Sequence, residues 1–477
     1  MAPRDTLVNQ VELGRAPIKP FRRLVGEVVW SELQSVIGSL KGAMGGRVLW
    51  NVNSTARGGG VAEMLASLIP YERDAGIDER WLVIQGSPDF FNTTKKIHSL
   101  LHGVEPDGGL LDDADRAHYE EATAVNAEAL AEMMHRGDVA ILHDPQTAGL
   151  VPALASRGIH VIWRAHIGVD EPNEAVRDAW EFLRPYLQDA SAYVFSRPSY
   201  AWDGLEDSRV RVLAPCIDPF AAKNQDLTVD SMDAILKAGG VVSGSDGRAS
   251  FVRHDGTRGR VTHSADLGGV TLPYEARVVT QVSRWDRLKD PIGVMDAFVC
   301  HIAPRTDAYL VLAGPAATSV KDDPEQPEVL QELTARRARI ARELRDRVVI
   351  AQLPMDDPDE NAAIVNALQR RSNVVVQKSL AEGFGLTVAE AMWKGRPVVA
   401  SSVGGIADQV QDGKNGLLVD DPHDLEGFGR AVVKLLEDER LARQLGAEAR
   451  RTVISKFITP CHLIAQARMV KDVLRQG

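Results

Sequence analysis

The stretch SLAEGFGLTVAEAMWKGRPVV, residues 379–399, decides the fold of this chain. A short run rich in valine precedes it at 373–376 (NVVV), and a second apolar run, PVVA, closes it at 397–400. Between the two runs the pattern predicts a helix over Leu386–Lys394, because a glycine and a proline follow and end it. A buried strand, a glycine turn, a helix and another buried strand are the repeating parts of a parallel α/β sheet.

The same alternation of strands and helices continues on both sides of this stretch. Helical patterns such as Val61–Ala75 and Ala117–Met134 separate short apolar runs that predict strands. These runs form two series, Arg47–Val52, Trp81–Ile84, Val139–Leu142, His160–Trp163 and Val210–Leu213, then Arg277–Val282, Tyr309–Ala313, Arg347–Ile350, Asn373–Val376 and Pro397–Ala400. Two such series predict an α/β fold of two Rossmann-like, doubly wound domains facing a cleft.

A glycine-rich, polar segment, 224–275, separates the two series. Within it HDGTRG reads as a turn between ASFVR and RVTH, which predicts a β-hairpin. We interpret the segment as an interdomain linker with an inserted hairpin, either a solvated excursion or a flap that contacts substrate. The predicted parts are an N-terminal domain, 1–223, the linker, 224–275, a C-terminal domain, 276–455, and a C-terminal helix, 456–477, that crosses back to the first domain.

Composition limits the class of protein. The chain has 477 residues, a formal net charge of −11, 44% hydrophobic residues and 25% charged residues, which excludes a disordered chain. No apolar run reaches the ~18 residues of a membrane span, and the N-terminus has no secretory signal pattern. The three cysteines lack metal-ligand spacing, so we expect a reduced, cytoplasmic protein without a metal site. The acidic charge also argues against a nucleic-acid partner.

The motif EGFGLTVAE combines two carboxylates with a glycine turn and a helix start. Glu382 precedes the turn, and Glu390 lies about one helical turn beyond it, so both could reach one extended ligand. Unpaired amides and the positive dipole end of the helix suit a phosphate. The competing interpretation is local, because Thr387-x-x-Glu390 also fits a capping box. A second glycine-rich turn, SSVGGIAD, lines the same site or is a plain strand-to-helix turn.

Two cations follow the first strand of the second series. Arg284 and Lys289 lie five residues apart in QVSRWDRLKD, just after RVVTQV. A diphosphate that spans both would satisfy them, with arginine supplying a fork of donors and lysine a point charge. The alternative is a surface ion pair with Asp286 or Asp290.

The first half of the chain offers three further clusters at strand ends. Three glycines in NSTARGGGVAEML, near Asn53 and Glu63, suit a sugar or phosphate site or form a tight turn. The cluster fits neither a dinucleotide fingerprint nor a P-loop. ILHDPQ and WRAHIG place polar side chains where ligands of open α/β sheets bind, and these groups suit sugar hydroxyls or are ordinary hydrogen-bonded residues.

These motifs together resemble a known family. EGFGLTVAE, with the two cations upstream and the glycine turn near the N-terminus, resembles retaining nucleotide-sugar glycosyltransferases of the two-Rossmann (GT-B, family 4) type. Over about Val48–Phe457 the chain is similar to trehalose glycosyltransferring synthases, in NSTARGGGVAEML, FFNTTKKIHSLLHG, LHDPQ, WRAHI, QVSRWD and EGFGLTVAEAMWKG. The segment 224–275 is longer than that family implies, and retaining trehalose phosphorylases have a similar core.

The resemblance implies an enzyme, a hexosyltransferase that makes trehalose from a nucleoside diphosphate glucose, such as UDP- or ADP-glucose, and glucose. Trehalose phosphorolysis and transfer to another sugar acceptor stay open as alternatives. A nucleotide-sugar isomerase and a non-catalytic sugar-nucleotide-binding protein are further alternatives, whereas an NAD-dependent oxidoreductase is disfavoured. The resemblance further implies no metal or other cofactor, no membrane insertion, small sugars and sugar nucleotides as ligands, and a homodimer.

Roles for individual residues come from the same resemblance. It implies that Arg284 and Lys289 neutralise the donor diphosphate, that Glu382 binds hydroxyls of the transferred sugar, and that His166 faces this sugar. The remaining donor-binding residues are Gly383, Phe384, Gly385, Leu386, Thr387 and, for the ribose, Glu390. The candidate acceptor-binding residues are Asn53, Gly58, Gly59, Gly60, Asp144, Gln146 and Arg164. The implied mechanism is a front-face displacement, in which the departing phosphate oxygen takes the acceptor proton.

Overall fold

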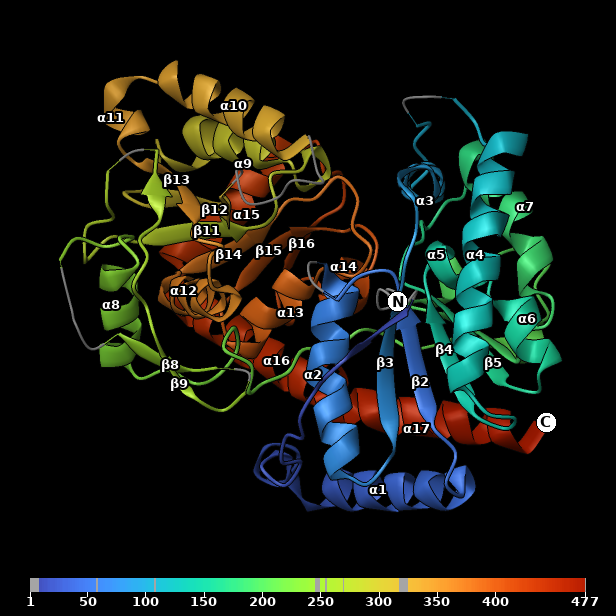
Figure 1. Ribbon diagram of the computed structural model, residues 1–477. Helices are drawn as coiled ribbons and strands as arrows, with labels where there is room; N and C mark the ends of the chain where they lie inside the picture. The colour runs from blue at the N-terminus through green and yellow to red at the C-terminus, as the bar shows by residue number, and fades with distance from the viewer. Residues whose placement is uncertain are drawn as a thin grey trace, which may run out of the picture. The chain divides into compact units, whose positions relative to one another are not determined.

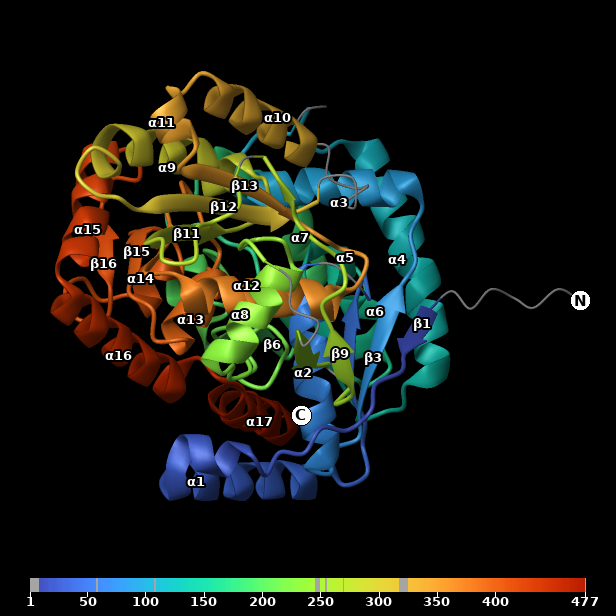
Figure 2. The same ribbon diagram turned by 90° about the vertical axis from the view of Figure 1, so that its left-hand side faces the viewer.

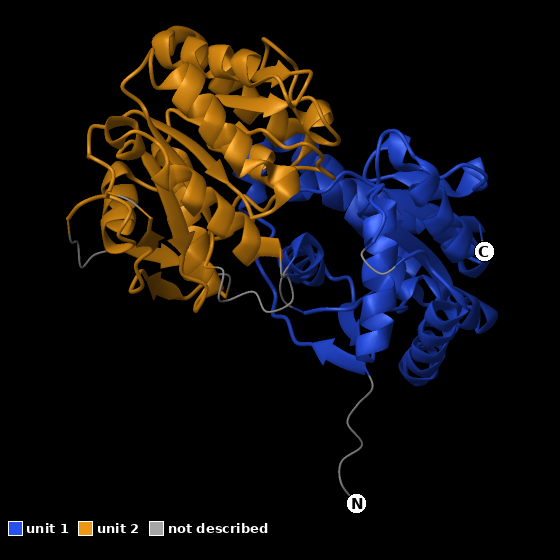
Figure 3. Ribbon diagram, turned by 90° about the horizontal axis from the view of Figure 1, so that it is seen from above, with its two compact units in different colours: residues 1–216, 459–477 blue, residues 217–458 orange. Residues whose placement is uncertain are grey.

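The computed structural model describes residues 8–56, 59–106, 109–244, 249–253, 255–268, 270–316 and 325–476. The chain divides into two compact units, Met1–Cys216 with Thr459–Gly477, and Ile217–Ile458 (Figure 3). Each unit contains a seven-stranded sheet, and the second unit has an additional two-stranded one. Among the residues described, the helices are too short or too polar to span a bilayer.

The sheet of the first unit is parallel except at one edge. Its order is β1-β3-β2-β4-β5-β6-β7, and β1 pairs antiparallel with β3. When the six parallel strands are numbered along the chain from β2, their order in the sheet reads 2-1-3-4-5-6, a doubly wound arrangement. The strands are β1 (Val8–Val11), β2 (Leu49–Asn53), β3 (Glu79–Ile84), β4 (Val139–His143), β5 (His160–Ala165), β6 (Ala192–Phe195) and β7 (Val210–Val212).

Helices cover both faces of this sheet because successive strand residues point to opposite sides. In β2, Trp50 and Val52 join a core with α3, α4 and α7, whereas Leu49 joins one with α1, α2 and α17. Helix α17 lies along α1 (Figure 2). The helices are α1 (Phe21–Met44), α2 (Gly60–Asp74), α3 (Pro88–Leu101), α4 (Asp113–Met133), α5 (Pro145–Ala148), α6 (Val151–Ser156), α7 (Glu174–Leu187) and α17 (Thr459–Gln476).

The sheet of the second unit has the Rossmann strand order. The strand order across the sheet is β10-β13-β12-β11-β14-β15-β16. When the parallel strands are numbered along the chain from β11, this order reads 3-2-1-4-5-6, and β10 pairs antiparallel at the edge. Its strands are β10 (Asp266–Leu267), β11 (Val278–Val282), β12 (Tyr309–Pro315), β13 (Val348–Leu353), β14 (Val374–Gln377), β15 (Val398–Ser401) and β16 (Leu417–Val419). The two sheets confirm the predicted α/β class with two Rossmann-like domains.

Helices α9, α10 and α15 pack on one face of this second sheet, and α8 and α12 pack on the other (Figure 1). The helices are α8 (Val229–Ala238), α9 (Pro291–Ala297), α10 (Glu325–Ala338), α11 (Arg342–Arg345), α12 (Pro358–Arg371), α13 (Leu386–Trp393), α14 (Ile406–Gln409), α15 (Leu425–Glu437) and α16 (Glu439–Lys456). The separate small hairpin consists of β8 (Ser250–Val252) and β9 (Arg258–Arg260).

The composition of segment 224–275 indicates an interdomain linker, but in the structure this segment packs within the second unit. Helix α8 buries Ile235 and Leu236 in a core shared with α12, and β10 pairs with β13. The unit boundary accordingly lies at Cys216–Ile217 and not at residue 223. The hairpin is present, although its second strand begins earlier than RVTH, and His254 in the expected turn lies outside the described residues.

Candidate functional site

The glycine turn of EGFGLTVAE stands at the carboxyl end of β14, where it starts α13. Gly385 is the N-cap residue, with φ of 85°, a conformation that glycine adopts without a Cβ penalty. No side chain caps this helix. The dipole of this helix favours an anion near its first-turn amides.

The capping-box interpretation of Glu390 is wrong. Thr387 lies inside the helix and its hydroxyl donates to Gln377 Oε1 at 3.2 Å, while Gly385 takes the N-cap position. Glu390 is buried on α13, 4% exposed, and its Oε1 lies 3.6 Å from Lys223 Nζ. The Glu390 carboxylate thus faces the ammonium group of Lys223 and has no capping role.

The structure brings Lys289 and Glu382 together. Lys289 Nζ donates to Glu382 Oε2 at 2.7 Å, and the Ser379 hydroxyl donates to the same oxygen at 3.3 Å. Both side chains of the ion pair are mostly buried, 18% and 11% exposed. The alternative partner of Lys289, Asp290, instead pairs with Lys378 and caps α9. A lysine ammonium and a carboxylate that can accept hydrogen bonds therefore lie side by side at the carboxyl end of the sheet.

Arg284 adopts the surface ion pair that the sequence left open. Its Nη2 lies 3.1 Å from Asp286 Oδ2, and its side chain is 59% exposed. An ion pair with so much water access stabilises by about 0–1 kcal/mol, so an incoming anion competes with Asp286 easily. Arg284 is therefore placed just after β11 with a side chain that a phosphate can recruit.

The second glycine-rich turn supports the first. Gly405 N donates to Gly383 O at 3.1 Å, and Gln409 Nε2 donates to Phe384 O. A Cβ on Gly405 would lie 2.6 Å from Phe384 Cα, closer than real Cβ contacts. SSVGG thus serves as the platform on which the EGFG backbone rests.

In the first unit, the ends of β4 and β5 are fastened to each other. Asp144 has a φ of 64°, which is strained for a residue other than glycine. Its amide donates to Arg164 O, and its Oδ1 accepts from His166 N, both at 2.8 Å. Removal from water raises the pKa of Asp144 to about 7. Gln146 lies half-buried on α5 beside it.

Two neutral histidines stand next to this carboxyl. His143 Nδ1 lies 2.9 Å from His166 Nε2, and the rings stack with centroids 5.2 Å apart. Burial, and then the nearby charge of Arg164, hold the pKa of both imidazoles well below the usual range. His143 uses both ring nitrogens inside the unit, so Nδ1 of the neutral His166 is the ring nitrogen of the pair that remains for a hydroxyl group of a neutral ligand such as a sugar.

The other predicted acceptor residues are buried or belong to the start of α2. Arg164 is 1% exposed and contacts His462, with Nη1 to Nε2 at 3.3 Å, so it lies behind the histidines. Asn53 is 3% exposed, and its amide is used by Trp81 Nε1 and Thr55 O. Gly59 caps α2 with φ of 83°, and Gly60 begins that helix. Gly58 lies outside the described residues.

The sequence analysis missed the polar groups behind these sites. Asn51 and Glu79 are fully buried in β2 and β3 and hydrogen-bond each other at 2.6 Å. Lys223, beside Glu390, is the last residue of the predicted N-terminal domain but belongs to the second unit. The available signal was the presence of polar residues inside otherwise apolar strands, LWNVN and ERWLVI.

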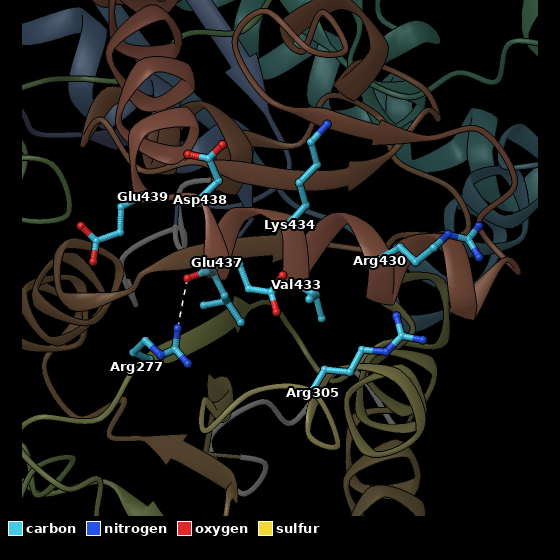
Figure 4. A pocket seen from close by; sticks show the side chains of 9 residues that line it. Arg277, Arg305, Arg430, Val433, Lys434, Glu437, Asp438 and Glu439 are labelled. Carbon is cyan, nitrogen blue, oxygen red and sulfur yellow. Dashed lines mark hydrogen bonds between the residues drawn. The ribbon is translucent and has the colours of Figure 1, made fainter.

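A pocket of about 820 Å³ in the second unit lies away from this chemistry (Figure 4). Arg277 and Arg305, which precede β11 and β12, contribute to it together with exposed residues of α15. It is therefore at the amino ends of the parallel strands, whereas the EGFG turn is at their carboxyl ends. Its four cations face three carboxylates, and it is open to solvent, so we assign it no part in the site.

Comparisons with known proteins agree with the resemblance. The family model for the N-terminal domain of trehalose synthase matches residues 51–202, and that for group 1 glycosyl transferases matches 269–452. Trehalose synthase of Rubrobacter xylanophilus is 35% identical over 472 residues, 98% of each chain. Trehalose phosphorylase of Pleurotus pulmonarius is 27% identical over 465 residues, 91% of this chain and 58% of the other.

The fold has close counterparts among solved structures. The α,α-trehalose 6-phosphate synthase of Burkholderia multivorans superposes with a TM-score of 0.64 at 16% identity, covering 90% of this chain and 98% of that one. This likeness shows the two-Rossmann GT-B fold, and the full-length identity to a trehalose synthase shows the family. The chain is a hexosyltransferase and belongs to the trehalose synthase family of glycosyltransferases.

Proposed function

We propose that the protein transfers a glucosyl group, with retention, from a nucleoside diphosphate glucose to glucose and so makes trehalose. The observation that carries this proposal is the Lys289–Glu382 pair beside the uncapped start of α13. A diphosphate needs cations and amide donors, and the sugar attached to it needs acceptors for its hydroxyls. This arrangement supplies both within the second unit, over residues that the glycosyl transferase model covers.

In this proposal each group of the donor has a partner. The α13 amides and Lys289 hold the phosphates, and Arg284 leaves Asp286 to join them. Glu382 accepts from hydroxyls of the transferred glucose, and Glu390, supported by Lys223, accepts from the ribose. In the first unit, Asp144, Gln146 and the neutral His166 are the candidates to bind sugar hydroxyls.

The proposed chemistry is electrostatic. As the glycosidic bond to phosphate breaks, negative charge grows on the departing oxygen, and fixed cations and amides stabilise it. The acceptor hydroxyl attacks from the same face and gives its proton to that oxygen. No carboxylate nucleophile is invoked, and the cations replace a metal, so we expect full turnover in EDTA.

A product survey tests the proposal. Glucose, fructose, mannose and glucose 6-phosphate are offered with UDP-, ADP- and GDP-glucose, and the sugars are separated by chromatography. Trehalose formed when glucose is the acceptor, without product from the other three acceptors, supports the proposal. Product with another acceptor only, or release of an altered sugar nucleotide without any acceptor, contradicts it.

Phosphorolysis of trehalose is the second candidate, favoured by the similarity to trehalose phosphorylase over 91% of this chain. Inorganic phosphate would then occupy the place of the donor phosphates. Trehalose is incubated with phosphate in one tube and with UDP or ADP in another. Glucose 1-phosphate in the first tube, with no sugar nucleotide in the second, selects the phosphorylase.

A further inference from the structure

A continuous chain of buried polar side chains runs through the first unit and ends at His166. It starts at Gln466 on α17, whose Nε2 donates to Glu72 of α2 at 3.1 Å. Glu72 adjoins Glu79 on β3, Asn51 on β2 donates to Glu79 Oε1 at 2.6 Å, and His143 Nε2 lies 3.0 Å from Asn51 Oδ1. Its members between Gln466 and His166 are at most 2% exposed.

The carboxyl pair gives this chain a direction. Burial, and then the neighbouring Glu79 carboxylate, raise the pKa of Glu72 well above its usual range, so Glu72 carries a proton. Among the described residues no amide, hydroxyl or cationic group donates to Glu79 Oε2, so the protonated Glu72 carboxyl is the group that donates a hydrogen bond to Glu79. Glu79 is thereby the acceptor for Asn51, which must turn its amide nitrogen toward Glu79 and its oxygen toward His143.

The tautomers of both histidines follow from the orientation of Asn51. Its Oδ1 can only accept, so His143 carries its proton on Nε2. Because His143 is neutral, its Nδ1 is then a lone pair and must accept from Nε2–H of His166 at 2.9 Å. A neutral His166 protonated on Nε2 has its own lone pair on Nδ1.

We propose that Glu79, Asn51 and His143 are positioning residues that hold His166 in the Nε2-protonated tautomer, so that its Nδ1 accepts a hydrogen bond from a hydroxyl of the bound sugar. The role of the hydroxyl rests on the proposed function. Burial and the nearby Arg164 favour the neutral ring of His166, and Asp144, the carboxyl beside it, binds the His166 amide. Arg164 Nε and Nη2 have no hydrogen-bond partner among the described residues, and Asp144 is a carboxyl that offsets part of the Arg164 charge.

The test reads the tautomer directly in the resting, full-length protein. Histidine is labelled with ¹⁵N, and the His166 signals are identified by their absence in His166→Gln. We expect a protonated Nε2 and a bare Nδ1 in the wild type. In His143→Leu we expect a mixture of tautomers, and in His143→Asn, whose Oδ1 can replace the lost acceptor, a return toward the wild-type signal.

A second pair of variants probes the chain at a residue that does not touch His166. Glu79→Gln keeps an acceptor for Asn51 and should preserve the tautomer, whereas Glu79→Leu frees Asn51 to rotate and should disturb it. His160→Leu, at the opposite end of β5, is the matched control and should change nothing. A His166 protonated on Nδ1 in the wild type, or unaffected by both leucine variants, overturns the proposal.

Kinetics separate this proposal from the function on which it rests. Loss of one oriented hydrogen bond should lower kcat in His143→Leu and Glu79→Leu by about tenfold, with KM for the nucleotide donor nearly unchanged, and His143→Asn should recover most of the loss. An equal fall of kcat in both His143 variants contradicts the positioning role. Failure of the product survey with the expected tautomer present rejects the function but leaves the chain of hydrogen bonds established.

Discussion

The pairing of Lys289 with Glu382 gives the sharpest prediction for a single side chain. Lys289→Ala removes a cation from beside the donor phosphate and leaves a mostly buried carboxylate without its ion-pair partner. We expect kcat/KM for the sugar nucleotide to fall about 10²-fold, or about 3 kcal/mol of transition-state stabilisation. Steady-state kinetics measure this. Lys434→Ala, on the exposed face of α15 (Figure 4), is the control, and equal values for the two variants would refute the assignment.

Asp144 predicts how activity depends on pH. Its pKa of about 7 lies above the value of about 3.9 for a free aspartate, so the folded protein still holds the proton between these values. Below pH 7 the neutral carboxyl is a poorer acceptor for sugar hydroxyls, and kcat/KM for the acceptor should rise as pH passes through about 7. His143 and His166 titrate far lower and add nothing there. In Asp144→Asn this rise should vanish, and a rise that persists would point to another group.

Individual residues show what the sequence can and cannot indicate. The family resemblance implied that Lys289 and Glu382 serve one ligand, a sugar nucleotide. It did not predict the direct ion pair, since its members are 93 residues apart and meet only when β11 pairs with β14. Asn53 shows a second limit of sequence reasoning. Its position at a strand end is right for a ligand, but Trp81 claims its oxygen inside the unit.

At the scale of elements, the contact between the two glycine turns predicts a sensitive position. Gly405→Ala places a Cβ 2.6 Å from Phe384 Cα and 2.8 Å from Gly383 O, so the backbone of the donor turn must move. Overpacking of this kind costs about 1–3 kcal/mol, and the displaced turn should raise KM for the donor. Gly38→Ala in α1, with nothing within 4 Å of the new atom, should be neutral or stabilising. Urea denaturation and donor titration distinguish the two.

The contact of the 224–275 segment with α12 should depend on pH. Glu360 Oε2 lies 2.9 Å from His263 Nδ1, and this hydrogen bond is the main cause that raises the pKa of His263. A raised pKa stabilises the fold below the unfolded value of about 6.5, and the effect is lost as pH rises through the folded pKa. His263→Ala should therefore lower the urea midpoint at pH 5.5 more than at pH 8.5.

The control for this pair is His423→Ala, an exposed histidine in the same unit. It should shift the midpoint equally little at both pH values. If His263→Ala behaves in the same way, the imidazolium makes no contribution, and the backbone amides of Thr262 and His263 with the Thr262 hydroxyl account for the contact with Glu360.

Elements bounded by clear signals were predicted well, and some short ones were not. Helices α2 and α13 begin within one residue of their predicted starts, because a glycine precedes each of them. Strands β6 and β16 were overlooked, although β7, β14 and β15 are equally short and were predicted. The two residues of β10 are defined only by pairing with β13, and α8 was hidden in a segment whose glycine and polar content indicates a linker.

The division of the whole molecule depends on contacts that are remote in sequence. The first unit is completed by residues 459–477, which follow the entire second unit along the chain. Local pattern identifies an amphipathic helix there, but not the surface that receives it. That surface consists of α1 and α2, whose apolar residues share one core with α17. Topology of this kind follows from burial of a complementary face and not from any motif.

Removal of α17 therefore tests how the first unit is stabilised. A chain ending at Ile458 loses several fully or almost fully buried apolar side chains of α17, Leu463, Ile464, Met469, Val470 and Val473. At about 1.5–3 kcal/mol each, an upper estimate, their sum reaches about 10 kcal/mol, comparable with the 5–15 kcal/mol of a whole domain. The hydrogen bonds of His462 to Arg164 and Gln466 to Glu72 disappear as well. We expect the first unit to unfold while the core of the second, which α17 does not enter, stays folded.

Tryptophan fluorescence can follow this selectively, because the first unit holds Trp30, Trp50, Trp81, Trp163, Trp180 and Trp202 and the second only Trp285 and Trp393. The emission of the truncated chain should shift to the red at 25 °C, while one cooperative thermal transition remains by circular dichroism. Arg468→Ala, an exposed α17 residue, is the control and should keep the native emission, because it retains the apolar face.

A synthetic peptide of residues 459–477 added in excess should restore part of the native emission, since binding only to the folded state draws the equilibrium toward it. Native emission from the truncated chain without the peptide would mean that the β-sheet and its remaining helices suffice, and that the apolar face of α17 contributes far less than its burial indicates.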